Sequence, residues 1–176
     1  MEEKAATNWK ELSGTLEGLL RLRTLPIGIK LFKSEEEMMK VPRIRRLQGK
    51  ATMCQVIYQA RSIGWTLGVV ATDFVGGNCA TVIGLATPAP DLMDGTRLTG
   101  VWFKEKVDAA KHQQAIPRVP AGNYHAAAFS PLSSGRLDPP DTVLMFGNPA
   151  QIILLINGLQ WKNYERYEFF CVGETA

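Results

Sequence analysis

The chain has 176 residues, of which 45% are hydrophobic and 21% are charged, and its formal net charge is +3. These values predict one globular domain over residues 1–176 and exclude a disordered or collagen-like chain. So small a charge argues against nucleic-acid binding, and the longest aliphatic run, residues 152–156, is too short to cross a membrane. Three cysteines are too few for a secreted disulfide framework, so we expect a cytoplasmic protein with reduced thiols.

The segment before Pro42 is predicted to form a helix, a strand and a second, short helix. Apolar residues spaced three or four apart predict a helix over about 8–22, capped by residue 7 or 8. Residues 26–32 alternate between the two faces as a strand does. Ser34 and Glu37 have the spacing of a capping box, which predicts a short helix that ends before the proline.

The next segment is predicted to form a helix, a buried strand and another short helix. Thr52 and Gln55 have capping-box spacing, so a helix is expected over about 53–62, ending near Gly64. Residues 66–72 have the apolar character of a buried strand. A turn follows, and we expect a short helix over residues 79–85 after it, capped by the side chain of residue 78.

After a loop-rich middle, the second half is predicted to contain a helix closed by Pro117 and strands over residues 124–132 and 142–146. Asn148 followed by proline predicts a helix that runs to about residue 158. This helix is apolar on nearly all sides, so we expect it to be buried. Residues 167–171 are typical of a final strand.

The alternation of helices and strands predicts an α+β or α/β fold with helices packed on a mixed sheet. Residues 53–80 and 150–176 share one order of elements: a helix, a tryptophan, a strand and a Val-Gly pair. That order is consistent with a weak internal duplication, and chance similarity between two helix-strand units is the simpler explanation.

Several short stretches resemble one family, the domain of unknown function 169 of archaea and many anaerobic bacteria. They are residues 25–30, 53–55, 78–79, 83–85, 141–144 and 171–174. The resemblance spans nearly the whole chain and implies a cysteine-bearing pocket, without implying a particular activity. Members of the family are usually longer and carry another cysteine in a further segment, so we expect this chain to lack a C-terminal segment.

Cys54 is a candidate site residue because cations precede it and a helix is expected to begin beside it. Arg43, Arg45, Arg46 and Lys50 lie within a dozen residues of it in the sequence. A helix N-terminus and nearby positive charge lower the pKa of a thiol and stabilise bound anions. The candidate ligand-binding residues here are therefore Arg45, Arg46, Lys50 and Cys54. The alternatives are a cysteine buried in the core and a solvated basic loop.

Cys79 follows Gly76, Gly77 and Asn78 at a turn between a strand and a helix. Successive backbone amides at such a turn can form an anion-binding nest, so all four residues are candidates for ligand binding. A turn that needs glycine for its positive φ explains the same pattern.

Cys54, Cys79 and Cys171 together are candidate ligands of an iron–sulfur cluster or another soft metal. No CxxC pair is present, and a fourth ligand would have to come from His112, His125, a substrate or the segment that the chain is expected to lack.

The first hypothesis is that the protein binds a cofactor or small anionic ligand in a cysteine-bearing pocket at helix N-termini. Cys54 and Cys79 are then expected to face one cleft, with their sulfurs within about 10 Å. The alternative is a thiol- or metal-dependent enzyme of anaerobic metabolism, and an assembly subunit without a site is the third interpretation. No general base accompanies either cysteine in the sequence, so binding comes first. The apolar segment 152–156 and the expected edge strand beside it predict a homo-oligomer, most simply a two-fold dimer.

Overall fold

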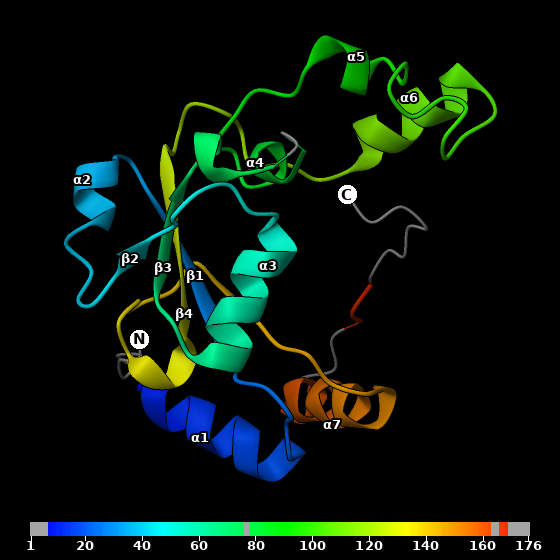
Figure 1. The fold of residues 1–176 in the computed structure, drawn as a ribbon. Helices are drawn as coiled ribbons and strands as arrows, with labels where there is room; N and C mark the ends of the chain where they lie inside the picture. The colour runs from blue at the N-terminus through cyan, green and yellow to red at the C-terminus, as the bar shows by residue number, and fades with distance from the viewer. Residues whose placement is uncertain (1–6, 76–77, 163–165, 169–176) are drawn as a thin grey trace, which may run out of the picture.

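A computed structural model of the protein describes residues 7–75, 78–162 and 166–168. Its centre is a five-stranded sheet in the order β2-β3-β4-β1-β5 (Figure 1). The strands are β1 (Ile27–Phe32), β2 (Arg45–Arg46), β3 (Leu67–Val70), β4 (Ala126–Pro131) and β5 (Thr142–Leu144). Strands β2 and β3 are parallel and the other pairs are antiparallel. Together with seven α-helices in the described residues, this mixed sheet makes the fold α+β, as predicted.

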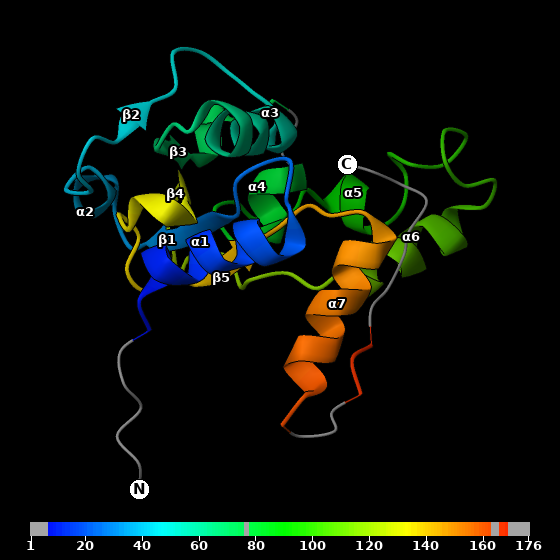
Figure 2. The same cartoon turned by 90° about the horizontal axis from the view of Figure 1, so that it is seen from below.

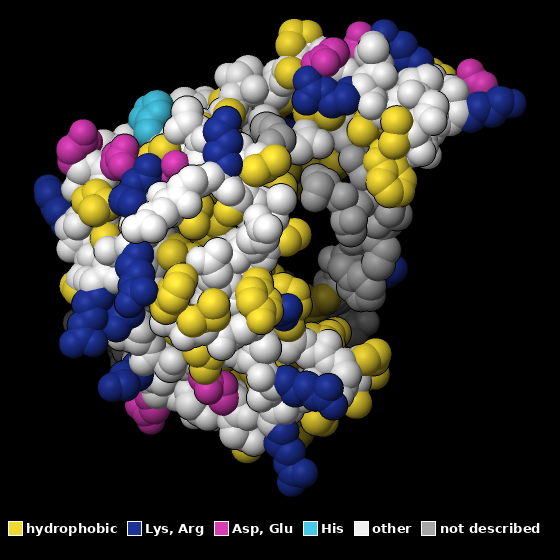
Figure 3. Space-filling view, viewed as in Figure 1, with side chains coloured by type: hydrophobic (Ala, Val, Ile, Leu, Met, Phe, Trp, Pro, Cys, Tyr) yellow, Lys and Arg dark blue, Asp and Glu magenta, His cyan; other side chains and the backbone are white. Residues whose placement is uncertain are grey.

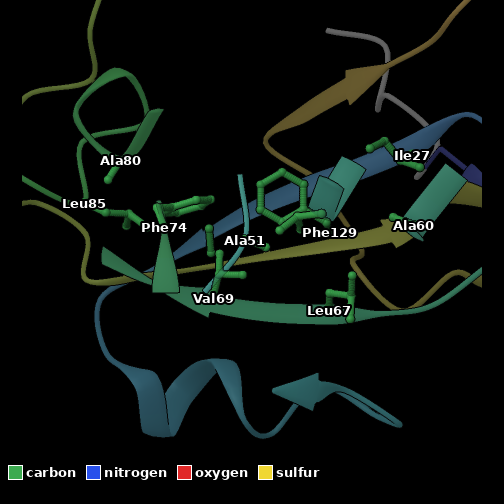
Figure 4. Close-up of a cluster of buried hydrophobic side chains, with 11 residues drawn as sticks. Ile27, Ala51, Ala60, Leu67, Val69, Phe74, Ala80, Leu85 and Phe129 are labelled. Carbon is green, nitrogen blue, oxygen red and sulfur yellow. The ribbon is translucent and has the colours of Figure 1, made fainter. Parts of the chain in front are cut away.

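Small side chains in β4 allow helices and loops to pack closely on both faces of the sheet. Its residues alternate, so Ala127 and Phe129 face one side while Ala126 and Ala128 face the other. The side with Phe129 carries the larger core, which includes residues from β1, β3 and the two helices that follow β2 and β3 (Figure 4). The opposite side packs against Phe32, Met38 and Leu137.

The helices of the first half begin where the capping residues predict. Helix α1 is Trp9–Leu20, and the Asn8 side chain accepts a hydrogen bond from the amide of Glu11. Helix α2 is Glu35–Met38, capped by Ser34. Helix α3 is Met53–Tyr58, with the complete capping box of Thr52 and Gln55, and it continues as a π-helix, Gln59–Ile63.

Three short helices lie at one end of the sheet, where α5 and α6 form a lobe that extends away from the strands (Figure 1). They are α4 (Asn78–Val82), α5 (Pro90–Met93) and α6 (Lys106–Ala115). Helix α5 lies in the part of the chain where only loops were expected. Gly95 allows α5 and α6 to meet, because a Cβ atom there would lie 2.5 Å from the carbonyl oxygen of Lys106.

The last helix, α7 (Pro149–Gln160), begins at Asn148 as predicted, but the prediction that it is buried is wrong. None of its residues is buried, and the side chains of Ile153 and Leu154 are 57% and 59% exposed. Figure 2 shows α7 extending away from the sheet. Gln151 ties its first turn to α1 by donating to the carbonyl oxygens of Leu20 and Arg21, at 2.7 and 3.0 Å. Helix α7 is thus hydrogen-bonded to α1 through its first turn, and its apolar side chains are at most partly covered by the described residues.

The predicted final strand lies largely outside the described residues, as does the last part of the second unit of the suggested repeat. Tyr167 and Glu168 are described and are not in a strand, and the remaining residues of that strand, 169–171, lie outside.

Candidate functional site: a basic pocket and two neighbouring thiols

The start of α3 is held beside the segment that follows β3. Ala51 and Phe74 form a parallel β-bridge, in which Ala51 donates to the carbonyl oxygen of Asp73 at 2.9 Å and accepts from the amide of Val75 at 3.0 Å. Because α3 begins two residues after Ala51 and α4 begins at residue 78, the bridge brings the first turns of these two helices together.

A pocket of about 790 Å³ lies between β2, the loop after it and one side of α3. Cations and amides on its wall include Arg45, Arg46, Lys50, Gln55 and Gln59, while Leu47, Leu67 and Trp65 supply apolar surface. We call this the basic pocket. Figure 3 shows Lys and Arg side chains gathered over β2, with apolar side chains between them and α3.

Arg46 is held in place by acidic residues. Its Nε lies 2.8 Å from a carboxylate oxygen of Glu35, and its Nη1 lies 2.6 Å from a carboxylate oxygen of Asp73 and 2.8 Å from the carbonyl oxygen of Gly68. The same carboxylate of Asp73 accepts a hydrogen bond from the amide of Val70. Arg46 therefore joins β2 to β3 and brings little uncompensated positive charge to the pocket.

Arg45 and Lys50 differ from Arg46, because neither forms an ion pair within the described part of the chain. The guanidinium carbon of Arg45 lies 4.8 Å from the ring centroid of Trp65, a cation–π distance. The stacking orients this guanidinium over an apolar surface on the pocket wall. An anion with a planar or apolar part could contact both the charge of Arg45 and the apolar surface of Trp65 there.

Cys54 and Cys79 are the second residues of α3 and α4. Cys54 is exposed and Cys79 is partly buried. Burial raises the pKa of the Cys79 thiol; a hydrogen bond from the backbone of Met53 opposes this effect, and the charge of a Cys54 thiolate raises the pKa further. The two thiols are thus electrostatic neighbours. Because Cys79 resists deprotonation, Cys54 is the more accessible nucleophile of the pair.

The predicted site residues separate into two groups. Arg45, Arg46 and Lys50 share the basic pocket, whereas neither Cys54 nor Cys79 is among the residues that line it. Asn78 was expected to cap α4 and is instead the first residue of the helix, with its side-chain Oδ1 buried and without a hydrogen-bond partner. Gly76 and Gly77 lie outside the described residues.

Sequence reasoning missed most of the basic pocket, including Trp65, which it assigned to the core or its rim, and the amides of Gln55 and Gln59. Gln55 was recognised as a capping residue only. Gln55 in α3 and Gln59 at the start of its π-helical continuation are four residues apart and line the same pocket, and this spacing could have marked one helical face as polar.

The proposed metal ligands fall partly outside the described residues, because Cys171 is not among those. Within the residues described, no group of three or more His, Cys, Asp or Glu side chains could hold a metal ion. No helix in the same residues is long and apolar enough to span a membrane.

These features define an α+β protein with a mixed sheet and a basic pocket beside its parallel pair of strands. The profile of the family domain of unknown function 169, described as uncharacterised ArCR, matches residues 15–176. The chain belongs to this family, which confirms the resemblance in its sequence. No curated protein and no solved structure matches it.

Proposed function

We propose that the protein binds a small anionic ligand in the basic pocket. The observation that carries this proposal is the pairing of uncompensated charge with an aromatic wall: Arg45 stacks on Trp65, and Lys50 lines the same pocket. A volume of about 790 Å³ is in the range of small-molecule sites, roughly 300–1,000 Å³. A ligand with an anionic group and a planar ring fits these walls, because the cations attract the charge and the indole packs on the ring.

The test compares charged and neutral forms of the same planar molecules. Adenosine 5′-monophosphate, flavin mononucleotide and benzoate are titrated calorimetrically against adenosine, riboflavin and benzamide, and native mass spectrometry detects any ligand that copurifies. We expect one of the anions to bind and its neutral partner to bind at least tenfold more weakly. Arg45→Gln should weaken that binding by about tenfold or more, since a hydrogen bond to a charged group contributes roughly 1.5–3 kcal/mol.

Arg43→Gln is the matched control for this variant. Arg43 lies on the same basic segment and is exposed, but it does not line the pocket. Its substitution removes the same charge and should change the affinity less than twofold. Equal weakening by both variants would mean that the general charge of the segment, and not the pocket, attracts the anion.

The second candidate function is that of a thiol- or metal-dependent enzyme, and the closeness of Cys54 and Cys79 favours it. Two thiols at neighbouring helix starts are suited to share a soft metal or to act in one reaction. Protein purified without oxygen should then contain iron and labile sulfide, or show a visible absorption band, that Cys54→Ser and Cys79→Ser each abolish. A colourless protein with unchanged thiol content and no bound metal would contradict the metal-dependent version of this candidate.

We also propose that the protein forms a homo-oligomer through α7. Its segment Pro149–Gln160 contains no charged residue, so two copies could pack across a two-fold axis without like charges meeting. Light scattering at micromolar concentration should give the mass of a dimer, and Ile153→Asp should give a monomer. Leu19→Asp is the control, because Leu19 is an exposed apolar residue of α1 and its substitution should leave the dimer intact.

A further inference from the structure

A second cavity lies between the π-helix Gln59–Ile63, which continues α3, and the beginning of α7. Its volume is about 420 Å³, and it shares no lining residue with the basic pocket. In Figure 3, Lys and Arg side chains lie in and around the hollow between these two helices. The residues that line it include Arg23, Thr24, Arg61, Phe146, Asn148 and Gln151.

The lining of this cavity is basic and unopposed. It includes two arginines and no acidic residue. Neither Arg23 nor Arg61 forms an ion pair with another described residue. The hydrogen bond from the amide of Leu25 to the carbonyl oxygen of Arg61, at 3.1 Å, holds their two segments together. The structure therefore places about two positive charges around one small cavity without a counter-charge on its wall.

Arg61 has a fixed orientation and an unmet hydrogen-bond donor. Its guanidinium carbon lies 3.9 Å from the ring centroid of Phe146, and its Nε is buried and has no hydrogen-bond partner. Burying a donor of a charged group without a partner is costly. An oxyanion in the cavity would compensate the charge of this guanidinium, whose planar fork can donate to two oxygens of one anion.

The first turn of α7 contributes to the same potential and is held rigidly. Helix α7 has 12 residues and points its N-terminus at the cavity, where the helix dipole is positive. The capping box of Asn148 and Gln151 uses the side-chain oxygens of both residues within the helix start. Gln151 also anchors this turn to the end of α1. The cavity wall is thus organised without a ligand, which lowers the entropy cost of binding.

We propose that this second cavity is a binding site for a phosphate group, separate from the ligand of the basic pocket. The two arginines and the Thr24 hydroxyl offer donors to the several acceptor oxygens of a phosphate dianion, and the positive end of the α7 dipole matches its charge. The phosphate is either free inorganic phosphate or the monoester group of a small molecule, since both present the same oxygens to these donors.

The experiment titrates the whole chain with inorganic phosphate and with phenyl phosphate by calorimetry, at constant low ionic strength. We expect saturable binding, and we expect Arg23→Gln to weaken it by about tenfold. Arg21→Gln removes the same charge two residues away, outside the cavity lining, and should change the affinity less than twofold. Tighter binding of phenyl phosphate would identify a phosphomonoester as the ligand, whereas binding of inorganic phosphate alone would identify the free ion.

Three results would overturn the proposal. The first is the absence of saturable binding of either probe to the wild-type chain. The second is equal weakening by Arg23→Gln and Arg21→Gln, which would show that diffuse charge and not the cavity holds the anion. The third concerns the basic pocket. Arg45→Gln separates the two sites, because it should leave phosphate binding in this cavity unchanged. If Arg45→Gln abolishes the binding and Arg23→Gln does not, the phosphate lies in the basic pocket and the second site does not exist. Arg61→Lys keeps a charge while removing the fork and should weaken binding without unfolding the chain.

Discussion

Helices α3 and α7 begin with the same local signal and yet occupy opposite environments. Each has a capping box with glutamine at its third position, Thr52 with Gln55 in one helix and Asn148 with Gln151 in the other. Together with its π-helical continuation, α3 packs Val56 and Ala60 fully into the core against the sheet. Helix α7 packs none of its residues fully.

The two helices show that the signal that starts a helix is independent of the packing that buries it. A capping box satisfies amide groups within the helix itself, so it acts wherever the sequence occurs. Burial requires another element to pack against the apolar side of the helix, and for α3 that element is the sheet. For α7 the described chain offers one point of attachment, at Gln151. An uncharged apolar helix is therefore evidence of a surface that needs cover, and that cover can come from outside the folded chain.

The two helices should differ most in how much the free energy of unfolding falls when one aspartate is placed on each. Val56→Asp puts a carboxylate into a fully buried position and should lower the free energy of unfolding by about 3 kcal/mol or more. Ile153→Asp puts the same group on an exposed position of α7 and should change this free energy by less than about 1 kcal/mol in the monomer. Urea unfolding at submicromolar concentration measures both.

A similar loss in the two variants would contradict the comparison, because it would mean that α7 is covered within the monomer. Val56→Ala serves as a milder second variant if Val56→Asp does not fold. It should still be clearly less stable than the wild type, since truncation of a fully buried side chain leaves a cavity.

A smaller difference is expected from removing the caps. Thr52→Ala and Asn148→Ala each delete a side-chain acceptor and should cost about 1 kcal/mol at the helix start. For α3 that cost should lower the global stability, because the helix forms part of the core. For α7 it should raise amide hydrogen exchange in that helix alone, because this segment can open without the sheet. Exchange measured by mass spectrometry at peptide resolution distinguishes a local effect from a global one.

The sequence alone predicts those parts of the fold that depend on neighbouring residues. Capping residues and periodicity correctly placed the starts of α1, α3 and α7 and the positions of strands β1, β3 and β4. The exposure of α7 was not predictable in this way, because its apolar character is the same whether the sheet or another molecule covers it. Helix α5 was missed because four residues, Pro90–Met93, are too few to show a helical period.

The sequence predicted that the site is basic, but not which residues share the pocket or form ion pairs. The run of cations was visible in the sequence, whereas the pairing of Arg46 with Glu35 and Asp73 joins residues far apart along the chain. Position in the sequence therefore could not show that carboxylates neutralise the charge of Arg46 and leave that of Arg45 uncompensated within the described residues. The same limit explains why the basic residues and Cys54 were placed in one pocket. They are close in sequence, but the arginines lie on β2 and Lys50 on the loop after it, whereas Cys54 lies in the first turn of α3, outside the pocket lining.

The smallest expected effect is on the alkylation rates of the two thiols in the first turns of α3 and α4. At α3, a hydrogen bond from the Met53 backbone reaches the Cys79 sulfur, and burial raises the pKa of that thiol above its ordinary value. A raised pKa keeps Cys79 in the neutral thiol form at neutral pH, and only the thiolate reacts with iodoacetamide. Cys79 should therefore be alkylated more slowly than the exposed Cys54, and its rate should keep rising at pH values above the ordinary thiol pKa. Peptide mapping of partly alkylated protein measures each site separately.

Two variants give this prediction its control. Cys54→Ser removes the neighbouring thiolate, which contributes to the raised pKa of Cys79, so Cys79 should react somewhat faster at high pH in this variant. Burial is the largest cause of the shift, so most of the difference from a free thiol should remain. Asn148→Ala changes the first turn of α7 only and should leave both thiol rates unchanged. If Cys79 instead reacts as fast as Cys54 at neutral pH, the Cys79 thiol is not buried against the first turn of α3, and the prediction fails.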